Sequence, residues 1–149
     1  TWLPSYGGEM RGGTANCAVK VSDNEIGSPF VYNPDILVVF NEPSLTKFQN
    51  TVKPGGYIFI NSSLVTKEDV RSDVTVVRVP ITEIATGLGN ARAANVVMLG
   101  ALVAMGPIVS EKAVLESLAE FFKDKGEKII DLNRRALSKG IKVGSTQEE

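Results

Sequence analysis

Histidine is absent from this sequence of 149 residues, and cysteine occurs once, as Cys17. Without imidazole, the chain has no histidine general base, no histidine metal ligand and no side chain that ordinarily titrates near neutral pH. A single thiol excludes an internal disulfide and an iron–sulfur cluster held by the cysteines of this chain alone. These absences favour a protein of a reducing compartment that does not carry out acid–base or redox catalysis unaided.

Neither sign of charge dominates, since 16 Lys and Arg accompany 17 Asp and Glu and the net charge is −1. This balance argues against a basic surface for nucleic acid or for anionic lipid. The longest uncharged stretch, residues 93–110, is interrupted by Asn95, two glycines and Pro107. A membrane span needs about 20 predominantly apolar residues. We therefore expect a cytoplasmic protein with neither nucleic acid nor membrane as a partner.

Apolar patterning in the first half of the chain predicts strands and an α/β domain. Residues 14–22 alternate in the manner of a strand, and Cys17 is expected in the core. Residues 36–40 and 57–60 are continuous apolar runs, which are typical of parallel strands buried on both faces. Helical spacing between these two runs completes a βαβ unit, and residues 74–79 supply a further strand.

Helical spacing dominates the second half. A short helix is expected over residues 82–88, followed by a buried helix over residues 91–105, because that segment is apolar nearly all round. Ser110 should cap the next helix, which Gly126 closes, and a last helix should run over residues 130–139. The apolar stripe of the capped helix comprises Val114, Leu115, Leu118, Phe121 and Phe122. We expect one domain across residues 1–149, with the last helix ending at Gly140 and a frayed tail over residues 144–149.

Polar residues follow the first two predicted strands of the parallel sheet. They are Asn41 and the triplet Asn61 to Ser63. Ligands gather at the carboxyl ends of parallel strands, so these side chains could bind one. They could instead cap helices and turns, which is the more common role of these residue types.

Residues 5–13, Ser-Tyr-Gly-Gly-Glu-Met-Arg-Gly-Gly, hold four glycines in nine positions. Glycine lets a backbone approach a ligand closely, and the guanidinium of Arg11 suits a phosphate or a carboxylate. Glu9 could instead pair with Arg11 and hold the loop in shape. No Gly-Lys-Ser/Thr follows, so this is not a P-loop. An anion-binding loop and a plain glycine-rich connection both stay open.

A second glycine-containing segment, residues 87–92, precedes the apolar helix. A helix N-terminus beside Arg92 is a candidate anion site, although the third glycine of the dinucleotide fingerprint is missing. Asn95 lies among apolar neighbours and must find hydrogen-bond partners, so we expect it in the core or in an interface. No carboxylate pair, metal-ligand cluster or nucleophile–base couple stands out. The residues favour a binding or interface domain over a self-sufficient catalyst.

Two motifs carry a resemblance to a known family. They are SYGGEMRGG at residues 5–13 and LGNARAANVVMLG at residues 88–100. With the segments between them, they resemble the gamma subunit of the 2-oxoacid:ferredoxin oxidoreductases from residue 1 to about residue 143. The form EMRGGTANC favours the 2-oxoisovalerate and 2-oxoglutarate types over pyruvate. Family members usually have proline where Gly8 stands, and they begin with a strand and a Gly-rich segment that this sequence lacks.

The resemblance implies a Rossmann-like three-layer α/β domain with a mostly parallel sheet flanked by helices. It also implies a subunit of a complex that converts a 2-oxoacid, coenzyme A and oxidised ferredoxin into acyl-coenzyme A, carbon dioxide and reduced ferredoxin. Thiamine diphosphate, magnesium and iron–sulfur clusters would lie in the alpha, beta and delta partner subunits. This chain would bind no metal and no cofactor by itself and would help to enclose coenzyme A.

By the same resemblance, the chain contains no catalytic residue. Arg11 would contact a phosphate of coenzyme A or a carboxylate of a catalytic subunit, and Gly12 and Gly13 would allow close backbone approach. The residues expected at coenzyme A or at a subunit interface are Tyr6, Gly7, Glu9, Arg11, Gly12, Gly13, Asn90 and Asn95. Two other hypotheses stay open: a free-standing nucleotide-binding module that uses residues 87–92, and a purely structural assembly subunit.

Overall fold

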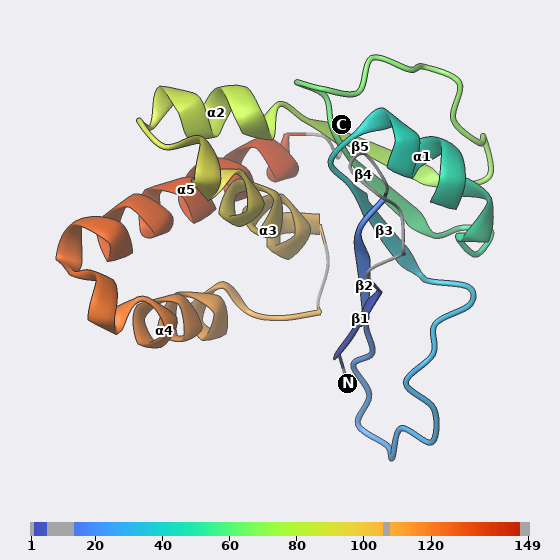
Figure 1. The fold of residues 1–149 in the computed structure, drawn as a ribbon, viewed down its shortest axis with the longest axis horizontal. Coiled ribbons are helices and arrows are strands. Elements are labelled where there is room, and N and C mark those ends of the chain that lie inside the picture. The colour runs from blue at the N-terminus through green and yellow to red at the C-terminus, as the bar shows by residue number, and fades with distance from the viewer. Residues whose placement is uncertain (1, 6–13, 106–107, 147–149) are drawn as a thin grey trace.

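Three parallel strands form the central sheet of the computed structural model, which describes residues 2–5, 14–105 and 108–146 (Figure 1). The strands are β3 (Ile36–Val39), β4 (Tyr57–Asn61) and β5 (Thr75–Val79), in the order β3-β4-β5. Phe59 of β4 lies beside Val38 of β3 and Val77 of β5. Both continuous apolar runs form parallel strands as predicted, and β4 is buried in four of its five residues. Full burial of the run 36–40 is wrong, because β3 is an edge strand in which only Val39 is buried, and Phe40, beyond its end, is 40% exposed.

Each face of this sheet is covered by helices, because successive side chains of a strand point to opposite faces. On one face, Ile58 and Ile60 pack with Leu45 of α1 (Glu42–Phe48). On the other face, Phe59 packs against α2 (Ile81–Gly87), α3 (Ala94–Met105) and α5 (Glu127–Ser145). Figure 1 shows α1 on the right of the strands and the other three helices on the left. The predicted α/β fold with helices on both faces of a parallel sheet is confirmed.

The connection from β3 to β4 follows the predicted βαβ pattern. Asn41 precedes α1, and its side-chain oxygen accepts a hydrogen bond from the backbone N–H of Ser44 at 3.0 Å. Pro43 stands in the first turn, where no intrahelical N–H is needed. The helix continues as a 3-10 turn, η1 (Gln49–Thr51), before the chain enters β4.

A separate antiparallel hairpin pairs β1 (Trp2–Ser5) with β2 (Asn16–Val19). Residues 2–5 were not predicted as a strand, and β2 is shorter than the alternating segment 14–22. Cys17 is exposed, so its predicted place in the core is wrong. The alternation of β2 indicates a strand, but this strand belongs to the hairpin and not to the buried three-stranded sheet.

Helices α3 and α5 pack with their backbones in contact. A Cβ atom on Gly140 would overlap the carbonyl oxygen of Val97, and one on Gly100 would overlap that of Leu137. The predicted end of the last helix at Gly140 is therefore wrong, because this glycine serves close packing inside α5. Gly144 is also helical and buried, so the helix continues into the predicted tail. Residues 147–149 of that tail lie outside the described residues.

The other helices of the second half lie close to their predicted positions. The segment 91–105 forms a 3-10 turn, η2 (Ala91–Ala93), and then α3, whose residues Val96, Val97 and Met98 are buried as expected. Helix α2 ends at Gly87, one residue before its predicted end. None of the helices in the described ranges combines the length and the apolar character that crossing a bilayer requires.

Helix α4 (Glu111–Phe121) begins at the predicted cap, since Oγ of Ser110 accepts from the backbone N–H of Ala113 at 3.2 Å. It ends at Phe121 and not at Gly126, and a 3-10 turn, η3 (Lys123–Lys125), leads into α5. Val114 is buried, but Phe121 is 79% exposed. The predicted stripe extends to Phe121, which shares a groove with Val114 and Leu118, but its exposed end is not packed in the core.

Candidate functional site

The structure places only part of the predicted site. Asn90 and Asn95 lie within the described residues. The six remaining predicted residues lie outside them: Tyr6, Gly7, Glu9, Arg11, Gly12 and Gly13. The segments that flank this loop are described, however, and they show where the chain enters and leaves it.

Both ends of the segment 6–13 join the β1–β2 hairpin. Ser5 pairs with Asn16 in the antiparallel register, so the chain returns beside the point at which it left. Thr14, directly after the segment, accepts a hydrogen bond at its Oγ1 from Nζ of Lys47 at 2.8 Å. Lys47 stands in the last turn of α1. The hairpin and α1 together therefore hold the base of the Gly-rich loop.

The carboxyl ends of the three parallel strands meet at Asn61, which is 1% exposed. Its Nδ2 donates to the carbonyl oxygen of Phe40 at 3.3 Å and to Oγ1 of Thr82 at 3.0 Å. Its Oδ1 accepts from the backbone N–H of Ser63 at 3.2 Å. Because both polar atoms of the amide are engaged within the chain, the capping interpretation of the triplet holds for Asn61. Oγ of Ser63 likewise accepts from the backbone N–H of Glu83 in the first turn of α2, at 3.2 Å.

The turn between α2 and α3 is also built from its own polar groups. Gly89 adopts a φ of 87°, a conformation that L side chains rarely adopt. The Oδ1 of Asn90 accepts from the backbone N–H of Arg92 at 3.0 Å, and its own N–H donates to the carbonyl oxygen of Ala85 at 3.0 Å. Asn90 thus caps η2, and an anion site at residues 87–92 stays a prediction.

Asn95 is exposed, whereas its neighbours Val96 and Val97 are buried. Its Oδ1 accepts from the adjacent backbone N–H of Val96 at 2.9 Å. A core position for Asn95 is therefore wrong, because the apolar residues around it in the sequence turn to the core and Asn95 does not. An interface with another chain stays a prediction.

The β1–β2 hairpin and the turn after α2 lie in different parts of the molecule. In Figure 1 the turn after α2 lies at the left, within the helical layer, whereas strands β1 and β2 lie at the right. The described structure therefore does not bring this turn next to the base of the Gly-rich loop.

Sequence reasoning missed an ion pair that fastens the β4–β5 connection. Arg71 donates from Nε to Oδ1 of Asp73 at 2.8 Å and from Nη2 to Oδ2 at 2.5 Å. Nη1 of the same guanidinium donates to the carbonyl oxygens of Gln49 and Val52, at 3.2 Å and 2.8 Å. The hydrogen bonds between the pair raise the pKa of Arg71 and lower the pKa of Asp73. Their role is structural, since they join this connection to the end of η1.

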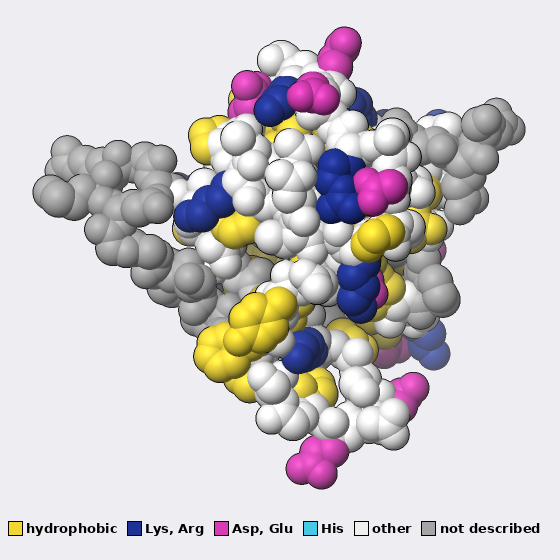
Figure 2. Space-filling view, turned by 90° about the vertical axis from the view of Figure 1, so that its right-hand side faces the viewer, with side chains coloured by type: hydrophobic (Ala, Val, Ile, Leu, Met, Phe, Trp, Pro, Cys, Tyr) yellow, Lys and Arg dark blue, Asp and Glu magenta, His cyan; other side chains and the backbone are white. Residues whose placement is uncertain are grey.

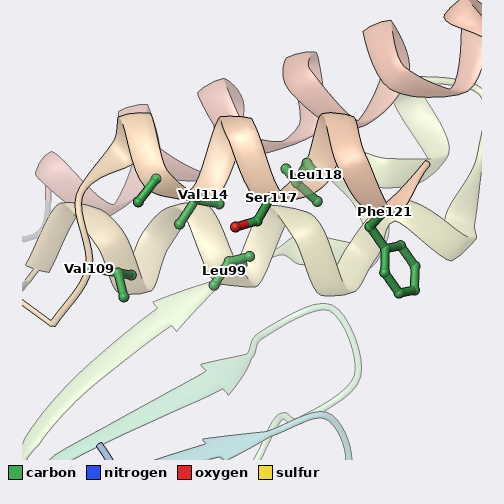
Figure 3. Close-up of a pocket in the computed structure, with 7 residues that line it drawn as sticks. Leu99, Val109, Val114, Ser117, Leu118 and Phe121 are labelled. Atoms are coloured by element: carbon green, nitrogen blue, oxygen red, sulfur yellow. The ribbon is translucent and has the colours of Figure 1, made fainter. Parts of the chain in front are cut away.

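An apolar groove of about 280 Å³ separates α3 from α4. Figure 3 shows its side chains, with Leu99 from α3 below and Leu118 from α4 above, and with the ring of Phe121 at one end. Ser117 is the one polar residue among those that line the groove. Such a lining suits apolar side chains and offers no group for chemistry. In the sequence, its signal was the stripe that extends to Phe121.

Hydrophobic side chains also gather in the lower part of the face that Figure 2 shows, below the sheet, where the β2–β3 connection descends in Figure 1. In this connection the rings of Phe30 and Tyr32 stack with centroids 6.3 Å apart, although the two residues are 55% and 78% exposed.

Within the described ranges, no three His, Cys, Asp or Glu residues are grouped so as to hold a metal ion.

Comparison with known proteins gives a family match over most of the chain. The model of the family described as pyruvate ferredoxin/flavodoxin oxidoreductase matches residues 1–143. Ketoisovalerate oxidoreductase subunit VorA of Methanothermobacter thermautotrophicus is 44% identical over 141 residues, which are 94% of this chain and 29% of that protein. 2-Oxoglutarate synthase subunit KorC of Methanocaldococcus jannaschii is 37% identical over 145 residues, which are 93% of this chain and 74% of that protein. The chain thus spans less than a third of the VorA subunit and about three quarters of KorC.

Two solved structures share the fold. The gamma subunit of keto/oxoacid ferredoxin oxidoreductase from Geobacter sulfurreducens superposes with a TM-score of 0.79 at 29% identity, covering 98% of this chain and 80% of that one. The 2-oxoglutarate:ferredoxin oxidoreductase of Magnetococcus marinus superposes with a TM-score of 0.87 at 24% identity, covering 97% of this chain and 25% of that one.

Proposed function

The chain belongs to the pyruvate ferredoxin/flavodoxin oxidoreductase family, as a gamma-type member, and we propose that it is a subunit of a 2-oxoacid:ferredoxin oxidoreductase. The complex would convert a 2-oxoacid, coenzyme A and oxidised ferredoxin into acyl-coenzyme A, carbon dioxide and reduced ferredoxin. The observation that carries this proposal is the family match over residues 1–143, because that range contains both motifs of the sequence.

The names of the relatives suggest the substrate class. One relative is a ketoisovalerate oxidoreductase subunit and another is a 2-oxoglutarate synthase subunit. We therefore propose a branched-chain 2-oxoacid or 2-oxoglutarate as the substrate. The alpha, beta and delta subunits, and ferredoxin as electron acceptor, would be the partners in the cytoplasm.

The reactive groups would belong to those partner subunits. Thiamine diphosphate, which needs magnesium, supplies the carbanion chemistry of such enzymes, and iron–sulfur clusters carry the electrons. The residues of this chain do not fit a cysteine-ligated cluster, since the only thiol is that of Cys17, exposed on β2. The chain would act by binding and by orienting coenzyme A.

We assign the coenzyme A contact to the Tyr6–Gly13 loop. The guanidinium of Arg11 would pair with a phosphate of coenzyme A, and Gly12 and Gly13 would let the backbone approach it. The geometry of the flanking residues supports this assignment, because the β1–β2 hairpin and α1 hold both ends of the loop. Asn95, exposed at the start of α3, would instead contact a partner subunit.

Two measurements test the proposal. First, the native chain should copurify with subunits that contain thiamine diphosphate and iron–sulfur clusters; a chain that elutes alone from its own cells would refute the proposed complex. Second, Arg11→Ala in the assembled enzyme should raise the KM for coenzyme A about tenfold and leave kcat within about twofold, as expected for lost ground-state binding.

A matched control is Arg135→Ala, since Arg135 is an exposed arginine that pairs with Asp131 at 3.0 Å on α5. It should leave the KM for coenzyme A unchanged. If Arg11→Ala also left that constant unchanged, the chain would be a purely structural assembly subunit. Binding of adenine nucleotides by the isolated chain, measured by calorimetry, would instead favour the free-standing nucleotide-binding module.

A further inference from the structure

We infer that Lys47 is a positioning residue of this subunit: through Thr14 it fixes the carboxyl end of the Gly-rich loop on α1. The observation is the hydrogen bond from Nζ of Lys47 to Oγ1 of Thr14, 2.8 Å long, between residues 33 positions apart in the sequence. The consequence for coenzyme A rests on the proposed function of the loop. The anchoring of Thr14 by Lys47 does not depend on that function, and it can be tested separately.

Thr14 is well suited to transmit this contact to the backbone. It is half-buried and stands two residues before Asn16, which is paired with Ser5 in the hairpin. Threonine is β-branched and therefore stiff at χ1, so a fixed hydroxyl also fixes the position of its main chain. The chain that leaves the loop is thus held from two sides, by the antiparallel ladder and by the ammonium group of Lys47.

Lys47 in turn extends from a well-anchored helix. Helix α1 is capped by Asn41 and buries Leu45 completely in the core. The Nζ of Lys47 lies 5.5 Å from the ring centroid of Phe48, within the range of a cation–π contact. The donor is charged, which makes its hydrogen bond stronger than one between neutral groups. These contacts make α1 a rigid support for the end of the loop.

An anchor matters at this place because the loop is rich in glycine. Glycine has more backbone conformations to lose on ordering than any other residue. A loop held at both ends has fewer arrangements to lose when it binds a ligand, and the ligand binds more tightly as a result. Removing the anchor should therefore weaken binding of the ligand without slowing the chemical step.

The test uses the assembled enzyme with Lys47→Met, Thr14→Val and the double variant. Hydrogen exchange of the backbone amides of residues 6–14 measures whether the loop is anchored. The KM and kcat for coenzyme A measure whether the anchoring affects binding of coenzyme A. We expect each single variant to speed exchange and to raise the KM about 3- to 10-fold, the factor that corresponds to one surface hydrogen bond. In the double variant the two effects should add to less than their sum, since both substitutions remove this hydrogen bond.

Lys53→Met is the matched control. Lys53 is also an exposed lysine close to α1, and its Nζ contacts Asp35 at 2.6 Å. This variant should alter neither the exchange of residues 6–14 nor the KM. This inference would be overturned, and the proposed function of the loop kept, if Lys47→Met changed neither the exchange nor the KM while Arg11→Ala raised the KM. Faster exchange with an unchanged KM in both Lys47→Met and Arg11→Ala would support the anchor and overturn the role of the loop in binding coenzyme A.

Discussion

Replacement of Gly140 by alanine should separate α3 from α5. A Cβ atom there would overlap the carbonyl oxygen of Val97, and it would also lie 2.8 Å from the carbonyl carbon of Val97 and 3.0 Å from the Cα of Gly100. All three atoms belong to backbone, so no flexible side chain can move aside. The two helices would have to part, and Leu137, fully buried beside Gly140, would lose contacts.

The magnitude follows from two opposing effects. Overpacking a rigid core costs about 1–3 kcal/mol, and the backbone clash places Gly140→Ala near 3 kcal/mol. Alanine inside a helix regains about 1 kcal/mol relative to glycine. The net loss in the free energy of unfolding should be about 2 kcal/mol. For a chain of this length the melting temperature should fall by about 4–8 °C.

Thermal and urea unfolding of the full chain, followed by circular dichroism, measure this loss. Gly87→Ala is the matched control, because Gly87 is the last residue of α2, and a Cβ there would meet no atom within 4 Å. That variant should be as stable as the wild type or slightly more stable. If Gly140→Ala were equally stable, the backbones of α3 and α5 would not be in contact, and the explanation of the long α5 would fail.

Three further predictions concern polar groups. Asp73→Asn should lower the melting temperature at pH 7. The pKa of Asp73 is lower in the folded than in the unfolded chain, so its carboxylate stabilises the fold above the unfolded pKa, and this stabilisation is lost as pH falls through the folded pKa. The difference in melting temperature between the variant and the wild type should therefore shrink below about pH 4. Asn61→Ala should cost about 2–3 kcal/mol in urea unfolding, since it removes three hydrogen bonds of a buried amide, against about 1 kcal/mol for the cap variant Asn41→Ala. Cys17 of the isolated native chain should react with a maleimide about as fast as in urea, and tenfold protection would contradict its exposure.

The central βαβ unit could be predicted because its signals are local. The apolar run 36–40 indicates a strand of the parallel sheet, and Asn41 followed by Pro43 indicates the start of a helix. Cys17 shows the limit of such signals. An alternating pattern indicates a strand, but it does not say whether the strand joins the buried sheet or an exposed hairpin, since that depends on which segment pairs with it.

Gly140, within the last helix, is a second case in which the local sequence allows two structural roles. Gly140 fits the end of a helix by its local sequence, yet the structure uses it for contact with Val97, 43 positions earlier. Contacts between distant residues decide such cases, and a single sequence does not record them. The same holds for Lys47 and Thr14, and for Arg71 with the carbonyl oxygens of Gln49 and Val52. The candidate loop could be found from its composition, but its support could not.

Three residues of the second family motif have a role in the fold of this chain. In the second motif, Gly89 supplies a backbone turn with positive φ, Asn90 caps η2 and Gly100 packs against α5. These three residues have roles in the fold, and a contact of Asn90 with coenzyme A or a partner subunit stays a prediction. Asn95 differs from them, because its side chain is exposed while its neighbours are buried. The proposed contact of this motif with a partner subunit therefore depends on Asn95, and the proposed contact with coenzyme A depends on the Gly-rich loop that Lys47 and the hairpin support.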